Sequence, residues 1–255
     1  MFKETITPLV LSILTISSAF AGGPDFVASH NLTYVGINSG FSLNIAQYSA
    51  TYDNTANNRS QEFDNTGYDS SLLLGLKIGH QWQISQSNDI FVEAGGFYNW
   101  AKIKDTSHLD DVVAPGTQPF DLINTIQPKL QLNLNLGIAH YINDSLSIHL
   151  NAGPSVLYVK SDYNTKGGNA LAIIDEGPSQ SETDWLWGGN IGFGIDMWLT
   201  QHSVLNCNIN DYVYASHDLK RVNNVDNTTP TGDNINSRKL FITMPAITFG
   251  YNYYF

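Results

Sequence analysis

The sequence predicts an all-β chain that closes into an eight-stranded antiparallel up-and-down transmembrane β-barrel with four long external loops and short periplasmic turns. Three observations support this prediction. Polar and apolar residues alternate with period two in eight segments, and these segments are joined in turn by tight turns and by long polar connections. No stretch after the amino terminus approaches about eighteen consecutive apolar residues, which excludes a membrane-spanning helix. Period-two alternation is typical of strands with two different faces.

The amino terminus carries the pattern of a secretory signal peptide. Lys3 provides a positive start, residues 9–16 are mainly apolar, and Ala19-Phe20-Ala21 has the small residues of a cleavage site. We therefore expect residues 1–21 to be a cleaved signal peptide and residues 22–255 to form one barrel domain.

The composition excludes some partners and ligands. Charged residues make up 14% of the chain, the formal net charge is −11, and Cys207 is the one cysteine. A nucleic-acid partner is not expected with this charge, and no internal disulfide can form. The acidic pairs Asp110-Asp111 and Asp175-Glu176 lack the spacing of a calcium loop and are interpreted as solvated loop residues. We expect no catalytic residue, no cofactor and no metal site.

The predicted strands and connections follow in order along the chain. Tight turns are expected around Ser85–Asp89, Asn143-Asp144 and Thr200–His202. An even number of strands returns both ends of the chain to the periplasmic side. The strands are expected near residues 31–45, 68–84, 90–103, 126–142, 145–160, 185–199, 203–218 and 239–255, and long mobile loops at 46–67, 104–125, 161–184 and 219–238.

The two faces of the strands indicate which side is the interior. Asn and Gly are poor strand formers in water, whereas a narrow lumen has room for small and amide side chains. A soluble barrel with an apolar interior would show the same period, but the composition of the polar face favours the inside-out arrangement. The predicted apolar faces are Leu72, Leu74, Leu76 and Ile78, then Leu130, Leu132, Leu134, Leu136 and Ile138, then Ile191, Phe193, Ile195 and Met197. The opposing polar faces are Gly75, Lys77, Gly79 and Gln81, then Gln131, Asn133, Asn135 and Gly137, then Asn190, Gly192, Gly194 and Asp196.

Several residues mark the membrane interfaces or break the alternation. The five tryptophans lie at strand ends, where we expect them at the two interfaces: Trp82, Trp100, Trp185, Trp187 and Trp198. Asp211 would face lipid after Leu205, Cys207 and Ile209, so a β-bulge near Asn210 is predicted to turn it inward and to put Tyr212 and Tyr214 outward. Pro154 and Pro245 lack an amide donor, so each is expected at a bulge or a gap in the ladder.

The last strand carries a family resemblance. The alternate residues Phe249, Tyr251, Tyr253 and Phe255 resemble the carboxy-terminal signal read by the outer-membrane assembly machinery. The whole mature chain resembles the small bacterial outer-membrane β-barrel superfamily of OmpA-like and opacity-type proteins, and with the chain ending at Phe255 no peptidoglycan-binding domain is expected. The resemblance implies the outer membrane of a bacterial cell as location, with membrane lipid, lipopolysaccharide and the assembly machinery as partners.

Five ionisable residues are expected to point into the lumen: Lys77, Glu93, Lys129, His149 and Asp196. Isolated charges in a filled lumen are unfavourable, so these residues should pair, and Lys77 with Glu93 on the neighbouring strand is the best candidate. An ion-pair network that satisfies the lumen is favoured over a gate that opens a narrow conduit.

Enzymatic activity is not expected. Lipid A-modifying enzymes resemble this architecture in size, but acyl transfer needs a nucleophile, a histidine and an acid in hydrogen-bond reach. Ser216-His217-Asp218 has these residue types, yet adjacent strand residues point to opposite faces.

The sequence therefore favours a non-enzymatic surface barrel with a structural or adhesin role in host interaction. The expected ligand contacts lie in the acidic loops at residues 46–67, 104–125, 161–184 and 219–238. A narrow channel for small or apolar solutes and a lipid A-modifying enzyme remain the alternatives.

Overall fold

The computed structural model describes residues 31–54, 59–109, 120–167, 180–216, 222–223 and 234–255. The expected signal peptide, residues 1–21, lies outside them. The described residues form ten β-strands: β1 (Asn31–Asn54), β2 (Arg59–Ser85), β3 (Asn88–Asn99), β4 (Ile103–Leu109), β5 (Phe120–Asn143), β6 (Leu146–Gly167), β7 (Gln180–Thr200), β8 (Ser203–Ser216), β9 (Val222–Asn223) and β10 (Asn234–Tyr254).

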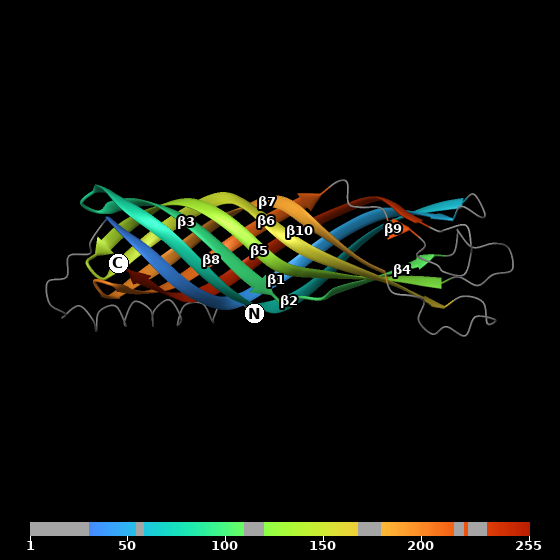
Figure 1. The fold of residues 1–255 in the computed structure, drawn as a ribbon, viewed down its shortest axis with the longest axis horizontal. Helices are drawn as coiled ribbons and strands as arrows, with labels where there is room; N and C mark the ends of the chain where they lie inside the picture. Colours follow the sequence, from blue (N-terminus) through green and yellow to red (C-terminus); the bar gives the residue numbers. More distant parts are fainter. Residues whose placement is uncertain (1–30, 55–58, 110–119, 168–179, 217–221, 224–233) are drawn as a thin grey trace, which may run out of the picture.

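Eight of these strands close into an antiparallel ring. The hydrogen-bonded order is β1-β2-β3-β5-β6-β7-β8-β10, and pairing of β10 with β1 closes the barrel. The two short strands lie off the ring, β4 on β5 and β9 on β10, at the end of the molecule opposite the carboxyl terminus (Figure 1). The predicted eight-stranded antiparallel barrel is confirmed as a ring, with β4 and β9 as additions to it.

The stagger of the ring defines its tilt. Pairing partners followed once around the ring from Gly36 return to β1 at Ala46, ten residues further along. A barrel with this stagger needs strands inclined by about 35–45° to its axis, and the crossing of front and back strands in Figure 1 reflects that inclination.

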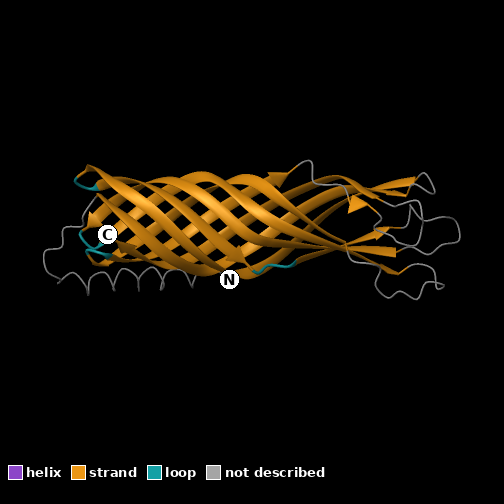
Figure 2. Cartoon of the chain, viewed as in Figure 1, coloured by secondary structure: helices purple, strands orange, loops and turns teal. Residues whose placement is uncertain are grey.

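Short turns occupy one end of the barrel, as predicted (Figure 2). Between β2 and β3, β5 and β6, and β7 and β8 the chain reverses within two residues. One boundary differs from the prediction, because Asp89 belongs to β3, pairs with Gln83 and Ala139, and is fully buried.

Parts of all four predicted loops are strands, and residues 55–58, 110–119, 168–179, 217–221 and 224–233 lie outside the described residues. The loop expected at 46–67 is mainly a continuation of β1 and β2, paired from Ala46 with Gly67 to Asn54 with Arg59. The other three also enter strands, since β4 pairs with β5, β6 and β7 extend along each other to Tyr163 with Gln180, and β10 begins at Asn234. These prolongations form an outer extension of the barrel.

The half of the barrel next to the short turns, the belt half, has an apolar exterior and an interior that is rich in buried polar residues. On β2 and β5 the outward residues are exposed leucines and isoleucines, while Gln131, Asn133 and Asn135 are buried inside. The faces predicted from the alternation are confirmed in this half. We call the outward apolar surface the apolar belt; Tyr68, Trp100, Trp185 and Trp187 stand at its outer edge.

The outer extension has the opposite arrangement. Its interior is filled by a cluster of buried apolar residues, which continues into the belt half at Leu73 and Tyr212. In the extension the cluster includes Leu122, Leu157, Leu186 and Ile103, each 0% exposed. Most outward positions there carry polar residues, with Ile123 as an exception. On β5 and β6 the amide of Gln127 donates to Asp162 at 2.6 Å, and Lys160 pairs with Asp162 at 2.8 Å. The extension is therefore organised like a water-soluble barrel.

Pro154 and Pro245 each interrupt a ladder, which confirms that prediction. The pairing of β5 with β6 is missing between Asn133–Ser155 and Leu136–Ala152, beside Pro154. The pairing of β1 with β10 is missing between Ser42–Ala246 and Ile45–Thr243, beside Pro245. In each case the register is the same on both sides, so these are gaps and not bulges.

The predicted bulge near Asn210 is wrong. β8 pairs without interruption through Asp211, with Pro245 on one side and Ile191 on the other. Asp211 is exposed on the apolar belt, and Tyr212 and Tyr214 fill the interior, at most 2% exposed. Burial of two large rings in the core offsets the unfavourable placement of one carboxylate outside.

The interface position expected for Trp198 is also wrong. Its side chain is 5% exposed and packs inside the barrel against Tyr254, with ring centroids 4.7 Å apart. The alternation of β7 places it on the inward face with Asp196, and that local signal overrides the general preference of tryptophan for interfaces.

No helix that could cross a membrane occurs among the described residues.

Candidate functional site

A layer of charged residues crosses the lumen near the short turns. Lys77 Nζ lies 2.9 Å from Glu93 Oε2, and both side chains are largely buried. The hydroxyl of Tyr34 donates to the same oxygen at 2.9 Å, and the ammonium of Lys77 lies 5.8 Å from the centre of the Tyr34 ring. The structure thus brings together the two residues named as the best candidate pair, on neighbouring strands.

A second pair completes this charged layer. His149 Nδ1 lies 2.8 Å from Asp196 Oδ2, and His149 Nε2 lies 2.8 Å from Asn208 Oδ1. Asn208 uses its own amide nitrogen to donate to Asn206, so its oxygen is available as an acceptor. Both ring nitrogens of His149 therefore face oxygen acceptors, an arrangement that favours the imidazolium and a true ion pair.

The predicted site residues do not include Asp89, which lies next to this layer on the side of the short turns. Asp89 accepts hydrogen bonds from Tyr141 at 3.0 Å and from Gln81 at 3.3 Å. The sequence predicts a turn at Asp89. However, Asp89, Phe91 and Glu93 are alternate residues of one strand, and this alternation indicates that Asp89 also faces inward.

Little space remains between the side chains of the charged layer. A cavity of about 20 Å³ remains among its side chains, bounded also by Trp198 and Tyr254, which is room for about one water molecule. Lys129 is not part of the layer. It lies at the shift of register between Pro128 and Leu130, half-buried, and forms no ion pair among the described residues.

A second polar cluster lies inside the outer extension. Arg238 is 0% exposed and donates to the hydroxyls of Tyr48, at 3.1 Å from Nε, and of Tyr163. The two hydroxyls are 3.3 Å apart. Burial raises the pKa of Tyr48 and of Tyr163, although the guanidinium of Arg238 acts in the opposite direction. Both phenols therefore stay neutral and accept hydrogen bonds from the cation.

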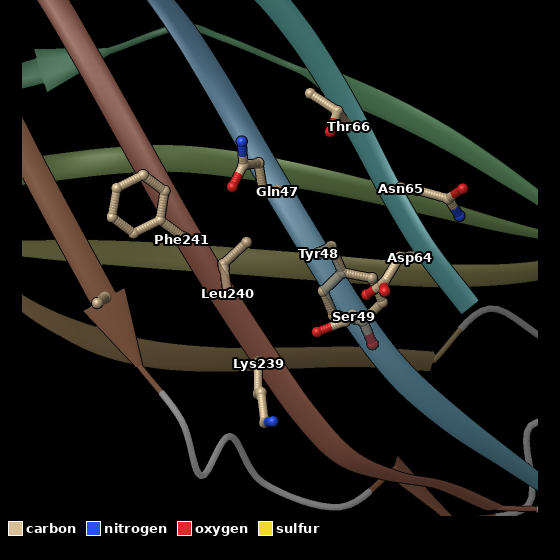
Figure 3. A pocket seen from close by; sticks show the side chains of 10 residues that line it. Gln47, Tyr48, Ser49, Asp64, Asn65, Thr66, Lys239, Leu240 and Phe241 are labelled. Carbon is tan, nitrogen blue, oxygen red and sulfur yellow. The ribbon is translucent and has the colours of Figure 1, made fainter. Parts of the chain in front are cut away.

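A cavity lies on the outer face of the barrel. Its volume is about 540 Å³, and it extends from β8 across β10 and β1 to β2. The last three strands lie side by side in Figure 3. We call it the outer groove. Its outward lining residues are Gln47, Ser49, Asp64, Thr66, Ala215, Lys239 and Phe241, and the inward-facing Tyr48, Asn65 and Leu240 complete it.

The remaining predicted residues have simple placements. Phe249, Tyr251, Tyr253 and Phe255 all face outward on the apolar belt, with 37% to 60% of their surface exposed. His217 and Asp218 of the Ser-His-Asp triplet and the acidic pairs at 110–111 and 175–176 lie outside the described residues. The part of the chain that the structure describes contains no group of three or more potential metal ligands.

A closed ring with an apolar belt outside and a polar lumen defines the class of this chain as a small β-barrel of the outer-membrane type. No family model matches the chain, and no curated protein matches it.

Several solved structures are similar to it. The outer membrane protein OprG from Pseudomonas aeruginosa is 14% identical, with 90% of this chain and 99% of that chain covered and a TM-score of 0.46. Ail, the attachment invasion locus protein of Yersinia pestis, is 13% identical over 86% and 98%, with a TM-score of 0.31. The outer membrane protease OmpT from Escherichia coli is 10% identical over 92% and 99%, with a TM-score of 0.36. Barrels of this kind support different activities, so the fold leaves the role open.

Proposed function

We propose that this chain is a non-enzymatic protein of the bacterial outer membrane that presents a surface for interaction with host cells or other extracellular ligands. The outer extension carries the proposal. Its interior is packed with fully buried apolar residues such as Leu122 and Leu186, while its exterior is polar. Such a segment is stable in water, so it would present its exterior to the medium beyond the membrane.

The interior supports a closed barrel over a channel. The charged layer leaves about 20 Å³ of space, and the apolar core of the extension fills the interior beyond it. An ion that crossed the barrel would have to break the Lys77–Glu93 pair and then pass an apolar plug. We expect no steady conductance in planar bilayers, and regular single-channel openings would replace this proposal with the narrow channel.

The surface role is tested by an exchange that leaves the strands intact. Residues 168–179, which connect β6 and β7, are replaced by a two-residue turn, and adhesion of cells that express the protein to cultured epithelial monolayers is measured. We expect adhesion to fall at least several-fold.

The matched control is the same replacement at residues 55–58, which shortens the tip of the extension by less. Gel mobility before and after boiling verifies that both variants fold. If cells that express the unaltered chain adhere no better than cells without the protein, the proposed surface role is refuted. If the 168–179 variant adheres as well as the unaltered chain, this segment takes no part in adhesion.

A further inference from the structure

The outer groove lies directly beyond the apolar belt. On β1 the last apolar outward residue is Ile45, which pairs with Tyr68 of β2, and the next outward residues, Gln47 and Thr66, already line the groove. On β10, Phe241 lines the groove at the edge of the belt. A molecule in the groove would therefore lie at the depth of the headgroups of the outer leaflet, beside the barrel wall and not above its mouth.

The register arranges the lining side chains in two rows. Gln47 stands between its partners Thr66 and Phe241. Two residues further outward, Ser49 stands between Asp64 and Lys239. With strands about 4.8 Å apart and about 3.4 Å per residue, these rows cover about 10 Å by 7 Å, which is the scale of one or two sugar rings.

The chemistry of the rows matches a sugar that carries one anionic substituent. Hydroxyl groups of a sugar donate and accept hydrogen bonds, and Gln47, Ser49 and Thr66 also do both. The carboxylate of Asp64 accepts from hydroxyls and repels anions, whereas Lys239 attracts them, so the two ends of the outer row differ in charge. The ring of Phe241 offers a flat apolar surface for the C–H face of a sugar.

We propose that the outer groove binds the sugar headgroup of an outer-leaflet glycolipid, with hydroxyls toward Asp64 and a phosphate or carboxylate substituent toward Lys239. The inference rests on the proposed placement in the outer membrane. The depth of the groove selects the source, because a glycolipid headgroup is held at that level by its own acyl chains, which would lie along the apolar belt. Bound glycolipid would orient the barrel and surround the base of the outer extension.

The test uses the full chain, purified in detergent, and native mass spectrometry with deep-rough lipopolysaccharide as the probe. We expect one tightly bound molecule, and we expect Lys239→Gln and Asp64→Asn each to weaken binding about tenfold, as loss of a hydrogen bond to a charged group predicts. The matched control is Lys160→Gln on β6. Lys160 is likewise the first outward residue beyond an aromatic residue, Tyr158, but it lies in a different part of the wall and is paired with Asp162.

Two further probes separate the sources. Lipid A without core sugars should bind more weakly than the deep-rough form, and the soluble core oligosaccharide should compete at high concentration. Equal binding of lipid A, or an equal loss with Lys160→Gln, would overturn the proposal, since acyl chains or general charge would then explain it. Binding of the soluble oligosaccharide without binding of the glycolipid would also overturn it. The adhesion assay is independent of these results, so either proposal can fail alone.

Discussion

The belt half and the outer extension are built from the same strands, yet along β1 the polar and the apolar face change places between them. On β1 the outward residues Ile37, Phe41 and Leu43 are exposed and apolar, and the inward Asn38 and Asn44 are buried and polar. Beyond Ile45 the outward residues are polar, from Gln47 onward, while the inward Ala46 and Tyr48 belong to the apolar core.

The difference between these two halves shows what the surroundings decide. Pairing of β1 with β2 continues without a shift of register from Asn31 to Asn54. The backbone hydrogen bonding is therefore the same in both halves. Hydrocarbon outside favours apolar exterior residues and hydrogen-bonded polar ones inside, and water outside favours the reverse. One continuous hydrogen-bonded ladder satisfies the backbone in both media.

Breaking the charged layer should have the largest effect. Lys77→Met leaves the carboxylate of Glu93 buried beside Tyr34, and we expect it to lower the free energy of unfolding by about 3–5 kcal/mol. Urea unfolding in lipid vesicles, followed by the change in gel mobility, measures this. The double variant Lys77→Met, Glu93→Gln should recover part of the loss. A double variant as unstable as the sum of the single ones would show that the two residues do not act as a pair.

A cavity inside the outer extension should lower the free energy of unfolding as it does in the core of a soluble protein. Leu122 is 0% exposed, and Leu122→Ala should lower the free energy of unfolding by about 2–5 kcal/mol through lost burial and the cavity left behind. The neighbouring outward Ile123 is half-exposed, so Ile123→Ala is the matched control and should change much less. Similar effects of both substitutions in the same urea titration would contradict a packed core in the extension.

Correcting the misplaced carboxylate should stabilise the belt. Asp211→Leu removes a charge from the lipid-facing surface between Ile209 and Val213, and we expect a gain of about 1–2 kcal/mol. The gain should appear in lipid vesicles. If Asp211→Leu instead destabilises the barrel there, the carboxylate has a favourable contact within the membrane.

The smallest expected effect concerns pH at the junction of β2 and β4. Asn65 donates to Asp105 at 2.8 Å, and burial raises the pKa of Asp105 above its ordinary 3.8, although this hydrogen bond acts in the opposite direction. Because the folded state holds the proton more tightly than the unfolded state, stability increases as the pH falls from above the raised pKa towards 3.8. Hydrogen exchange of β4 amides, corrected for intrinsic rates, should slow over this range, and Asp105→Asn should abolish the dependence.

Much of the belt half could be predicted from the sequence. An apolar exterior and a narrow polar interior impose a strict alternation, so the inward positions of Lys77 and Glu93 follow from their places in the alternating pattern. The predictions for Asp211 and Trp198 were wrong for the same reason: both residues follow the local alternation of their strands and not the general preference of their residue type. The ladder between β7 and β8 shifts register only after Trp198.

The extension was missed because its signal is weaker. Residues such as Ala46, Tyr48 and Ala50 alternate with Gln47 and Ser49, but the polar side is rich in residues that also occur in loops. The interior there is assembled from strands far apart in the chain, as in the contact of Arg238 with Tyr48 and Tyr163. No local period contains that information.

The sequence by itself determined the strands of the belt half, their two faces and the pairing of Lys77 with Glu93. These features depend on an alternation with a period of two residues and on contacts between neighbouring strands. Only the tertiary structure decided the height of the barrel and the outer groove. These depend on how a closed ring with a stagger of ten residues brings distant segments to one level, and closure is a property of the whole ring.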